Sequence, residues 1–398
     1  MQDNPSQENQ ESKENQEVCN TAEEREERIL ITPLKEEDDW HEIREDLESL
    51  EEEVEPSPWA SWEYYYEWWR HFGRDKAVWL VQCHQGEMPL ATAFWMEERQ
   101  ERRGVTFHAL RSMDTMAMRT PPYLYARGRE KEAVEAMTRA LPMLVGQCRA
   151  ELLTLYRQDE KALTPWLHEL EAQQFRYSRR VFTHSDLIDF PETFDQYKSS
   201  LRHSLIKNIE RSERKIETDF GQPMRLEHLH GNLFADPRFE KIWPCFERLR
   251  NHSWQVENAR EKELVDTRIL TRFTRMTGEL WSRKKALDLT LILIKGQPVS
   301  FLLGISMGDR YYAYLTGYDR EYRSYGVGAL AFLKALEQAH ARGERLVELG
   351  GEGSEWKREY ATRQSSLLQV EIPLPGIKGR IWSLFQKLKH GDENEEVR

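Results

Sequence analysis

The sequence predicts an α/β fold with a mixed sheet, in which one order of elements occurs twice along 398 residues. Short runs of apolar residues separated by glycine-containing turns are typical of antiparallel strands. Longer runs with apolar residues three and four apart are typical of helices packed on such a sheet. In the first half these patterns predict strands at 77–84, 89–97 and 105–110, an irregular loop at 111–129, a helix at 130–148 and a strand at 151–156.

The second half repeats that order about 210 residues further along the chain. Gly296 and Gly308 mark the turns between its strands, and Gly343 follows the expected helix, as is common just past a helix end. We therefore expect a duplicated α/β domain, on the pattern of elements rather than on sequence identity. The predicted elements are strands at 287–294, 298–306 and 310–316, a helix at 326–342, and strands at 345–349 and 366–372.

Composition supports two packed domains without a membrane span. With 39% hydrophobic residues and 13 tryptophans, we expect an N-terminal domain at 29–190 and a C-terminal domain at 191–390. Residues 1–28 are acidic and nearly devoid of apolar side chains, which predicts a disordered tail. The net charge of −12 argues against a general nucleic-acid binder. Four scattered cysteines favour free thiols, and without a signal peptide or a long apolar run we expect a cytoplasmic protein.

Three helical segments each allow a structural and a functional interpretation. The segment 59–72 carries eight aromatic residues, which fit either a packed core stripe of Trp62, Tyr65, Tyr66 and Trp69 or a stacking platform for sugars or bases. The segment 194–216 reads as one long basic helix, either a solvated face or an electropositive wall that attracts an anionic substrate. The basic amphipathic segment 377–390 either docks on its own domain or makes a peripheral membrane contact. Further helices are expected at 38–53, 237–251 and 261–280, and a short strand at 29–34.

The most specific motif lies where the third strand of the second half leads into its helix. Two glycines there let the backbone approach a ligand closely, and the first turn of a helix presents unpaired N–H groups and a positive dipole end. An arginine adds a full charge, so the motif predicts a phosphate cradle. The cradle residues are Arg323, Ser324, Tyr325, Gly326, Val327 and Gly328.

This string resembles the coenzyme A pyrophosphate loop of the GNAT acyltransferase superfamily, whose pattern is Gln/Arg-x-x-Gly-x-Gly/Ala. The wider run TGYDREYRSYGVGALAFLKALEQAHARG…VELGGEGSEWKREYA is similar to the FemAB-like or CelD-type acetyltransferase family. The resemblance covers about residues 56–385 and implies tandem GNAT-like domains. It also implies acetyl-CoA or another acyl-CoA as co-substrate and no metal. The first copy lacks the glycine string, so it is expected to be a degenerate partner that shapes a cleft.

The resemblance implies a direct attack of an amine on a thioester, and the residues supply candidates for each role. Glu352 is the first choice for the general base and Asp319 the second, with a capping or solvent-facing carboxylate as the structural alternative. Tyr318 and Tyr325 are candidate proton donors to the leaving thiolate. Lys357 is expected either to contact a phosphate, to pair with Glu352 or to be an ordinary surface lysine. A backbone N–H near residues 314–316, where the central strands splay apart in this superfamily, is expected to meet the thioester carbonyl.

Three functions stay open on the sequence alone. The leading hypothesis is an acyl-CoA-dependent N-acyltransferase acting on an amine of a saccharide, lipid or peptide precursor, with cell-envelope or exopolysaccharide synthesis as its candidate role. The others are a FemAB-like transferase that uses aminoacyl-tRNA and a non-catalytic interaction protein, since Glu352 and Trp356 replace the family's usual acid and tyrosine. His228 and His230 alternate like residues on one strand face but lack a third ligand nearby, so we expect no metal site there.

Overall fold

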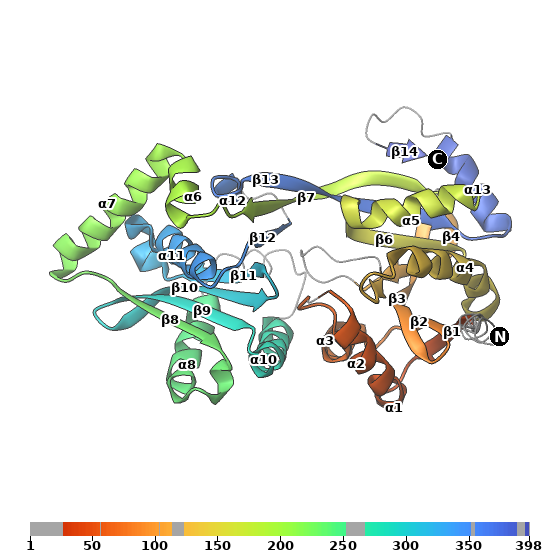
Figure 1. Cartoon of the computed structure of the whole chain (residues 1–398), viewed down its shortest axis with the longest axis horizontal. Helices are drawn as coiled ribbons and strands as arrows, with labels where there is room; N and C mark the ends of the chain where they lie inside the picture. The colour runs from red at the N-terminus through yellow and green to blue at the C-terminus, as the bar shows by residue number, and fades with distance from the viewer. Residues whose placement is uncertain are drawn as a thin grey trace, which may run out of the picture.

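The computed structural model describes residues 27–55, 57–102, 104–113, 123–251, 267–351, 355–387 and 395–397. Its N-terminal half contains the predicted meander of strands, helix and strand (Figure 1). The strands are β1 (Glu27–Leu34), β2 (Val78–Gln85), β3 (Met88–Arg102), β4 (Val105–Ser112), β5 (Leu124–Tyr125), β6 (Leu152–Asp159) and β7 (Ser178–Asp189). The helices are α1 (Glu37–Glu42), α2 (Arg44–Glu53), α3 (Trp62–Trp68), α4 (Glu130–Cys148) and α5 (Glu160–Ala172).

The C-terminal half repeats this order, which confirms the duplication. Its strands are β8 (Arg225–Gly231), β9 (Leu287–Ile294), β10 (Gln297–Met307), β11 (Arg310–Tyr318), β12 (Leu346–Gly351), β13 (Arg363–Pro373) and the short β14 (Glu395–Val397). Its helices are α6 (Phe194–Ser200), α7 (His203–Phe220), α8 (Pro237–Asn251), α10 (Thr267–Arg283), α11 (Val327–Ala341), α12 (Glu355–Arg358) and α13 (Ile377–Lys387). None of the helices built from these residues is both long and apolar enough to cross a bilayer.

One mixed sheet joins the two halves, in the order β1-β2-β3-β4-β6-β13-β7-β12-β11-β10-β9-β8. Within each half four strands run antiparallel, and a fifth pairs in parallel with the fourth, β6 with β4 and β12 with β11. The last strands are exchanged at the centre, because β13 pairs with β6 of the first half while β7 pairs with β12 of the second. The exchange makes the sheet continuous across the molecule (Figure 1).

The C-terminal half buries both faces of its sheet under different helices. On β10, Leu302 belongs to the core beneath α7 and α11, whereas Phe301 and Leu303 belong to the core that α8, α10 and α3 cover. This alternation follows from the two-residue period of a strand. The second core is shared between the halves, so α3 of the first half packs directly on α10 of the second.

The aromatic helix forms part of that shared core, which confirms the packed stripe over the stacking platform. Trp62, Tyr65, Tyr66 and Trp69 are each no more than 9% exposed. The C-terminal helix α13 is likewise docked, since Trp382 is buried and its indole N–H donates to Glu371 of β13 at 3.1 Å.

Two long helices predicted from the sequence are each divided in two. The segment 38–53 breaks at Ile43, which separates α1 from α2. The segment 194–216 breaks at Leu201, where an extended backbone (ψ 156°) separates α6 from α7. Helix α7 then continues to Phe220 and ends at Gly221, whose left-handed conformation suits glycine. The expected tail up to residue 26 and part of the loop at 111–129 (residues 114–122) lie outside the described residues.

The divided helix also differs in charge from the predicted basic wall. Helix α7 carries four basic and four acidic residues, so its formal charge is balanced. The basic residues are Lys207, Arg211, Arg214 and Lys215, and the acidic residues are Glu210, Glu213, Glu217 and Asp219. The interpretation as a solvated face therefore fits this helix better than an electropositive wall does.

Candidate functional site

The central feature of the C-terminal half is a gap between the parallel strands β11 and β12. They pair only at Arg310–Tyr312 with Leu346–Glu348 and separate beyond those residues. On its other side β11 has a bulge against β10, because Gly304 pairs with Ala313 while the preceding Leu303 pairs with Leu315. A bulge bends a strand and increases its twist. The segment 314–316, predicted to offer an oxyanion N–H, lies just past the paired residues.

The predicted phosphate cradle follows β11 at the start of α11. Residues Arg320–Tyr325 form a turn of 3₁₀ helix, and Gly326 links it to α11 with a φ of +60°, a conformation that favours glycine. The Gly326 N–H donates to the Arg323 carbonyl at 3.2 Å, so this donor is already used inside the loop and is not available to a ligand. The donors that begin α11 are therefore the N–H groups of residues 327–329, which lack an intrahelical acceptor by position.

Helix α7 covers one side of this loop. A Cβ atom added at Gly326 would lie 2.7 Å from the Ser212 hydroxyl, so only glycine fits there without a shift of Ser212. The Lys215 ammonium lies 3.4 Å from the Ser324 carbonyl and 4.4 Å from the Tyr325 ring centroid. Arg323 and Ser324 of the loop are both exposed.

The two candidate proton donors lie on different sides of the loop. The Tyr325 hydroxyl donates to Asp219 of α7 at 3.0 Å, and this hydrogen bond raises the pKa of Tyr325. Tyr325 is therefore a weaker acid and is directed toward α7. The Tyr318 ring packs against the first turn of α11, 3.2 Å from where a Cβ of Gly328 would lie. Of the two tyrosines, Tyr318 is the one that packs on the start of α11.

Two of the remaining predicted residues lie on described elements. The Asp319 carboxylate accepts the Glu321 N–H at 3.1 Å and so acts as the cap of the 3₁₀ turn. Lys357 lies on α12, which is anchored by Trp356 packing edge-on against Phe332 of α11 at 5.1 Å. Glu352, the first choice for the base, lies outside the described residues.

A buried carboxylate that the sequence reasoning passed over lies at the gap itself. Glu348 is 2% exposed, is the last β12 residue paired with β11, and lies opposite Tyr312. Its neighbours Val347 and Leu349 pack beneath α11, so strand alternation places Glu348 on the opposite face, toward α10. The Arg310 guanidinium lies 3.9 Å from it. The signal in the sequence was one acid in the otherwise uncharged strand LVELGG.

His228 and His230 do share one strand face, at the other end of β9–β11. Both face the buried Asp288, at 2.7 Å and 3.6 Å. Arg342 of α11 lies 2.8 Å from the same carboxylate, and the Tyr311 hydroxyl donates to it at 2.9 Å. Within the described ranges no group of three or more His, Cys, Asp and Glu side chains is arranged to hold a metal. The two histidines thus belong to a buried ionic cluster.

Comparisons with known proteins bear on the same region. Residues 203–358 match the family model described as an acetyltransferase (GNAT) domain, a span from α7 through α12 that includes the gap and the cradle. No curated protein matches the sequence significantly. The crystal structure of FemX is similar with a TM-score of 0.57 and 8% identity, covering 86% of this chain and 98% of that one.

Two further solved structures are similar over most of the chain. One is the C-terminal domain of a putative lysylphosphatidylglycerol synthetase from Agrobacterium fabrum, with a TM-score of 0.48 and 10% identity, covering 89% of this chain and 99% of that one. The other is a tandem GNAT protein from the clavulanic acid biosynthesis pathway, with a TM-score of 0.41 and 13% identity, covering 88% and 100%. The likeness to FemX concerns the fold alone. Residues 203–358 are therefore similar to acetyltransferase (GNAT) domains, and the chain as a whole has a fold similar to that of FemX.

Proposed function

We propose that the protein is an N-acyltransferase that uses acetyl-CoA or another acyl-CoA as donor. The observation that carries the proposal is the gap between β11 and β12, which lies next to a helix start with an exposed arginine in the segment that matches the acetyltransferase model. Backbone N–H groups, a helix dipole and one guanidinium suit a diphosphate. The open strand edges at the gap supply unpaired N–H groups that suit the oxygen of a thioester.

In the proposed mechanism, a group of this chain meets each chemical requirement of the reaction. The diphosphate binds beside Arg323 and the N–H groups of 327–329. The acceptor amine loses a proton to Glu348 or, through it, to solvent, and attacks the thioester carbon. The carbon–sulfur bond then breaks, and the thiolate takes a proton from Tyr318 or water. A positioned general base contributes about 10²–10⁴ in rate, and one oxyanion donor about 10²–10³.

The acceptor class is proposed from the position of Glu348. This carboxylate faces the side of the sheet that α10 and α3 cover, opposite the α7 and α11 side. An amine of a saccharide, lipid or peptide precursor would therefore enter from the α10 side, while the donor enters beside α11. Use in cell-envelope or exopolysaccharide synthesis is part of the same proposal. We also propose a peripheral membrane contact through α13, because its apolar residues Ile377 and Leu384 are exposed.

The two other functions have less support. An aminoacyl-tRNA donor needs a surface for a polyanion, and the balanced charge of α7 does not provide one. A non-catalytic role would not require a buried carboxylate at the gap, where an apolar residue would cost less to bury.

Release of coenzyme A thiol tests the proposal. Wild-type protein would be incubated with acetyl-CoA and one amine at a time: glucosamine, a lysine-containing peptide, and phosphatidylethanolamine in vesicles. We expect thiol release that depends on one amine class, with an equal amount of N-acetylated product by mass spectrometry. Transfer from aminoacyl-tRNA but not from acetyl-CoA, or no transfer with any amine, would contradict it.

A further inference from the structure

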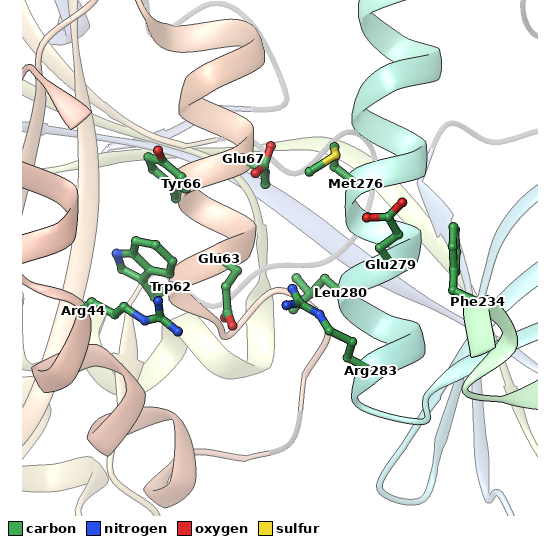
Figure 2. Close-up of a pocket in the computed structure, with 10 residues that line it drawn as sticks. All are labelled: Arg44, Trp62, Glu63, Tyr66, Glu67, Phe234, Met276, Glu279, Leu280 and Arg283. Carbon is green, nitrogen blue, oxygen red and sulfur yellow. The ribbon is translucent and has the colours of Figure 1, made fainter. Parts of the chain in front are cut away.

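A cavity of about 550 Å³ opens between the two halves, and no residue of β11 or β12 lines it. Figure 2 shows its two main walls, α3 of the first half and α10 of the second. Apolar packing beneath it holds these walls together, because Trp281 of α10 packs against Trp59 at 5.6 Å and Tyr64 at 6.5 Å. The Trp281 indole N–H also donates to the Pro58 carbonyl at 3.3 Å. The packed contact between the two halves therefore holds the walls of the cavity in place.

Most charged groups on the cavity walls already have partners in the protein. Glu67 lies 3.1 Å from Arg70, and Glu279 lies 3.5 Å from Arg275. Arg44 pairs with Glu48 at 2.6 Å, and its guanidinium stacks 5.0 Å above the Trp62 ring. These contacts fix the side chains but leave little of their charge for a ligand.

Two groups of opposite charge, one on each wall, lack a close partner, although Arg44 still acts on Glu63 electrostatically. Glu63 of α3 and Arg283 of α10 form no hydrogen bond or ion pair with any described residue, and the Glu63 Oε2 atom is buried. Glu67, one helical turn further, differs from Glu63, because its second oxygen lies 3.5 Å from His71 Nδ1 and its first is paired with Arg70. In Figure 2 both glutamates lie on the side of α3 that faces α10, and Arg283 extends from α10 toward that wall.

An uncompensated buried carboxylate oxygen is costly, so the Oε2 atom of Glu63 indicates a missing donor. An ammonium group beside Glu63 would supply that donor. Arg283 on the facing wall offers the planar fork that binds a carboxylate. The two sites together match a molecule that carries both charges.

The rest of the lining is apolar and aromatic. Trp62 and Tyr66 stack at 4.9 Å on one wall, and Phe234, Met276 and Leu280 line the other. Such a surface favours an apolar body between the two charged ends. A sugar or a nucleotide would make few apolar contacts with this surface.

We propose that this cavity binds a small zwitterion, an amino acid with an apolar side chain. Its ammonium pairs with Glu63, its carboxylate pairs with Arg283, and its side chain packs on Trp62 and Met276. Because the ligand contacts α3 and α10, it joins the two halves and stabilises their contact. The site is separate from the proposed acyl-transfer site, so its test does not require coenzyme A.

The test measures binding to the full chain by thermal shift and calorimetry. The probes are L-leucine, L-methionine, L-phenylalanine and L-tryptophan, together with phenethylamine and 3-phenylpropanoate, which each keep only one charge of L-phenylalanine. We expect at least one of the four amino acids to raise the melting temperature and bind at a single site. Phenethylamine and 3-phenylpropanoate should bind at least about tenfold more weakly than L-phenylalanine, since each loses one charge-assisted contact.

Variants locate the site. Glu63→Gln and Arg283→Gln should each weaken binding of the amino acid at least about tenfold. Glu279→Gln, whose carboxylate on the same cavity is already paired with Arg275, should leave it nearly unchanged. The proposal is overturned if no amino acid binds below millimolar concentration, if phenethylamine binds as tightly as L-phenylalanine, or if all three variants behave alike. Melting of the variants without ligand shows whether each is folded.

Discussion

Replacing Glu348 with glutamine should lower kcat for acyl transfer by about 10²–10⁴, with little change in the affinity for acetyl-CoA. The amide has the same shape but cannot accept the proton of the attacking amine. Glu348 is buried at the gap and faces the side opposite α11, so its loss should not disturb the diphosphate cradle. Steady-state thiol release and calorimetric binding of acetyl-CoA separate the two effects.

A purely structural role of Glu348 makes a different prediction. One ionic neighbour of Glu348 is Arg310, 3.9 Å away and 38% exposed at the side chain. If the carboxylate served only this contact, Arg310→Gln would reduce kcat as much as Glu348→Gln does. We expect Arg310→Gln to retain most of the activity. Equal losses in the two variants would remove Glu348 as the candidate base.

Replacing Asp288 with asparagine should lower the free energy of unfolding by about 3–5 kcal/mol, because it removes one partner of a buried ionic cluster. The carboxylate is 0% exposed and contacts His228, Arg342 and Tyr311. The neighbouring backbone leaves no room to adjust, since a Cβ at Gly304 would lie 2.2 Å from the Tyr311 ring. Urea unfolding measures the loss. Asp189→Asn, on an exposed carboxylate paired with Arg363, should cost less than about 1 kcal/mol.

The same variant should change the acid dependence of stability. Burial opposes ionisation of Asp288, but the His228 and His230 rings and the Arg342 guanidinium outweigh it and lower the pKa of Asp288 well below its usual value. A lowered folded-state pKa gives stability that is present above about pH 4, where the unfolded carboxylate titrates, and is lost as the pH falls below it. Wild type should therefore lose more stability than Asp288→Asn between about pH 4 and pH 2. Parallel curves would contradict this assignment.

Elements that depend on local pattern could be predicted from the sequence. Strand β9 and helix α4 have the predicted bounds. A run of alternating leucines is typical of a strand, and a 19-residue amphipathic segment is typical of a helix, so few other structures are compatible with either segment. Helix α5 and strand β7 were not predicted. The exchange of β7 and β13 between the halves is a pairing of distant segments, and no local signal in either strand specifies its partner.

The candidate site was predicted in part, for the same reason. The glycine string did mark the start of α11, since Gly326 needs a positive φ that its neighbours could not adopt as easily. Contacts from α7 to this loop, through Ser212 and Asp219, join segments about 110 residues apart and were not foreseen. Glu348 was missed because the base was sought after the strand end rather than within the strand.

The proposed donor site is tested most directly by calorimetric titration of the full chain with acetyl-CoA. We predict one site per chain with a dissociation constant roughly between micromolar and millimolar. Arg323→Glu reverses an exposed charge beside the cradle and should weaken binding at least about tenfold. Arg272→Glu, an exposed position on α10 beyond the opposite face of the sheet, should bind as wild type does. Absence of binding to wild type, or equal binding to all three proteins, would contradict the account.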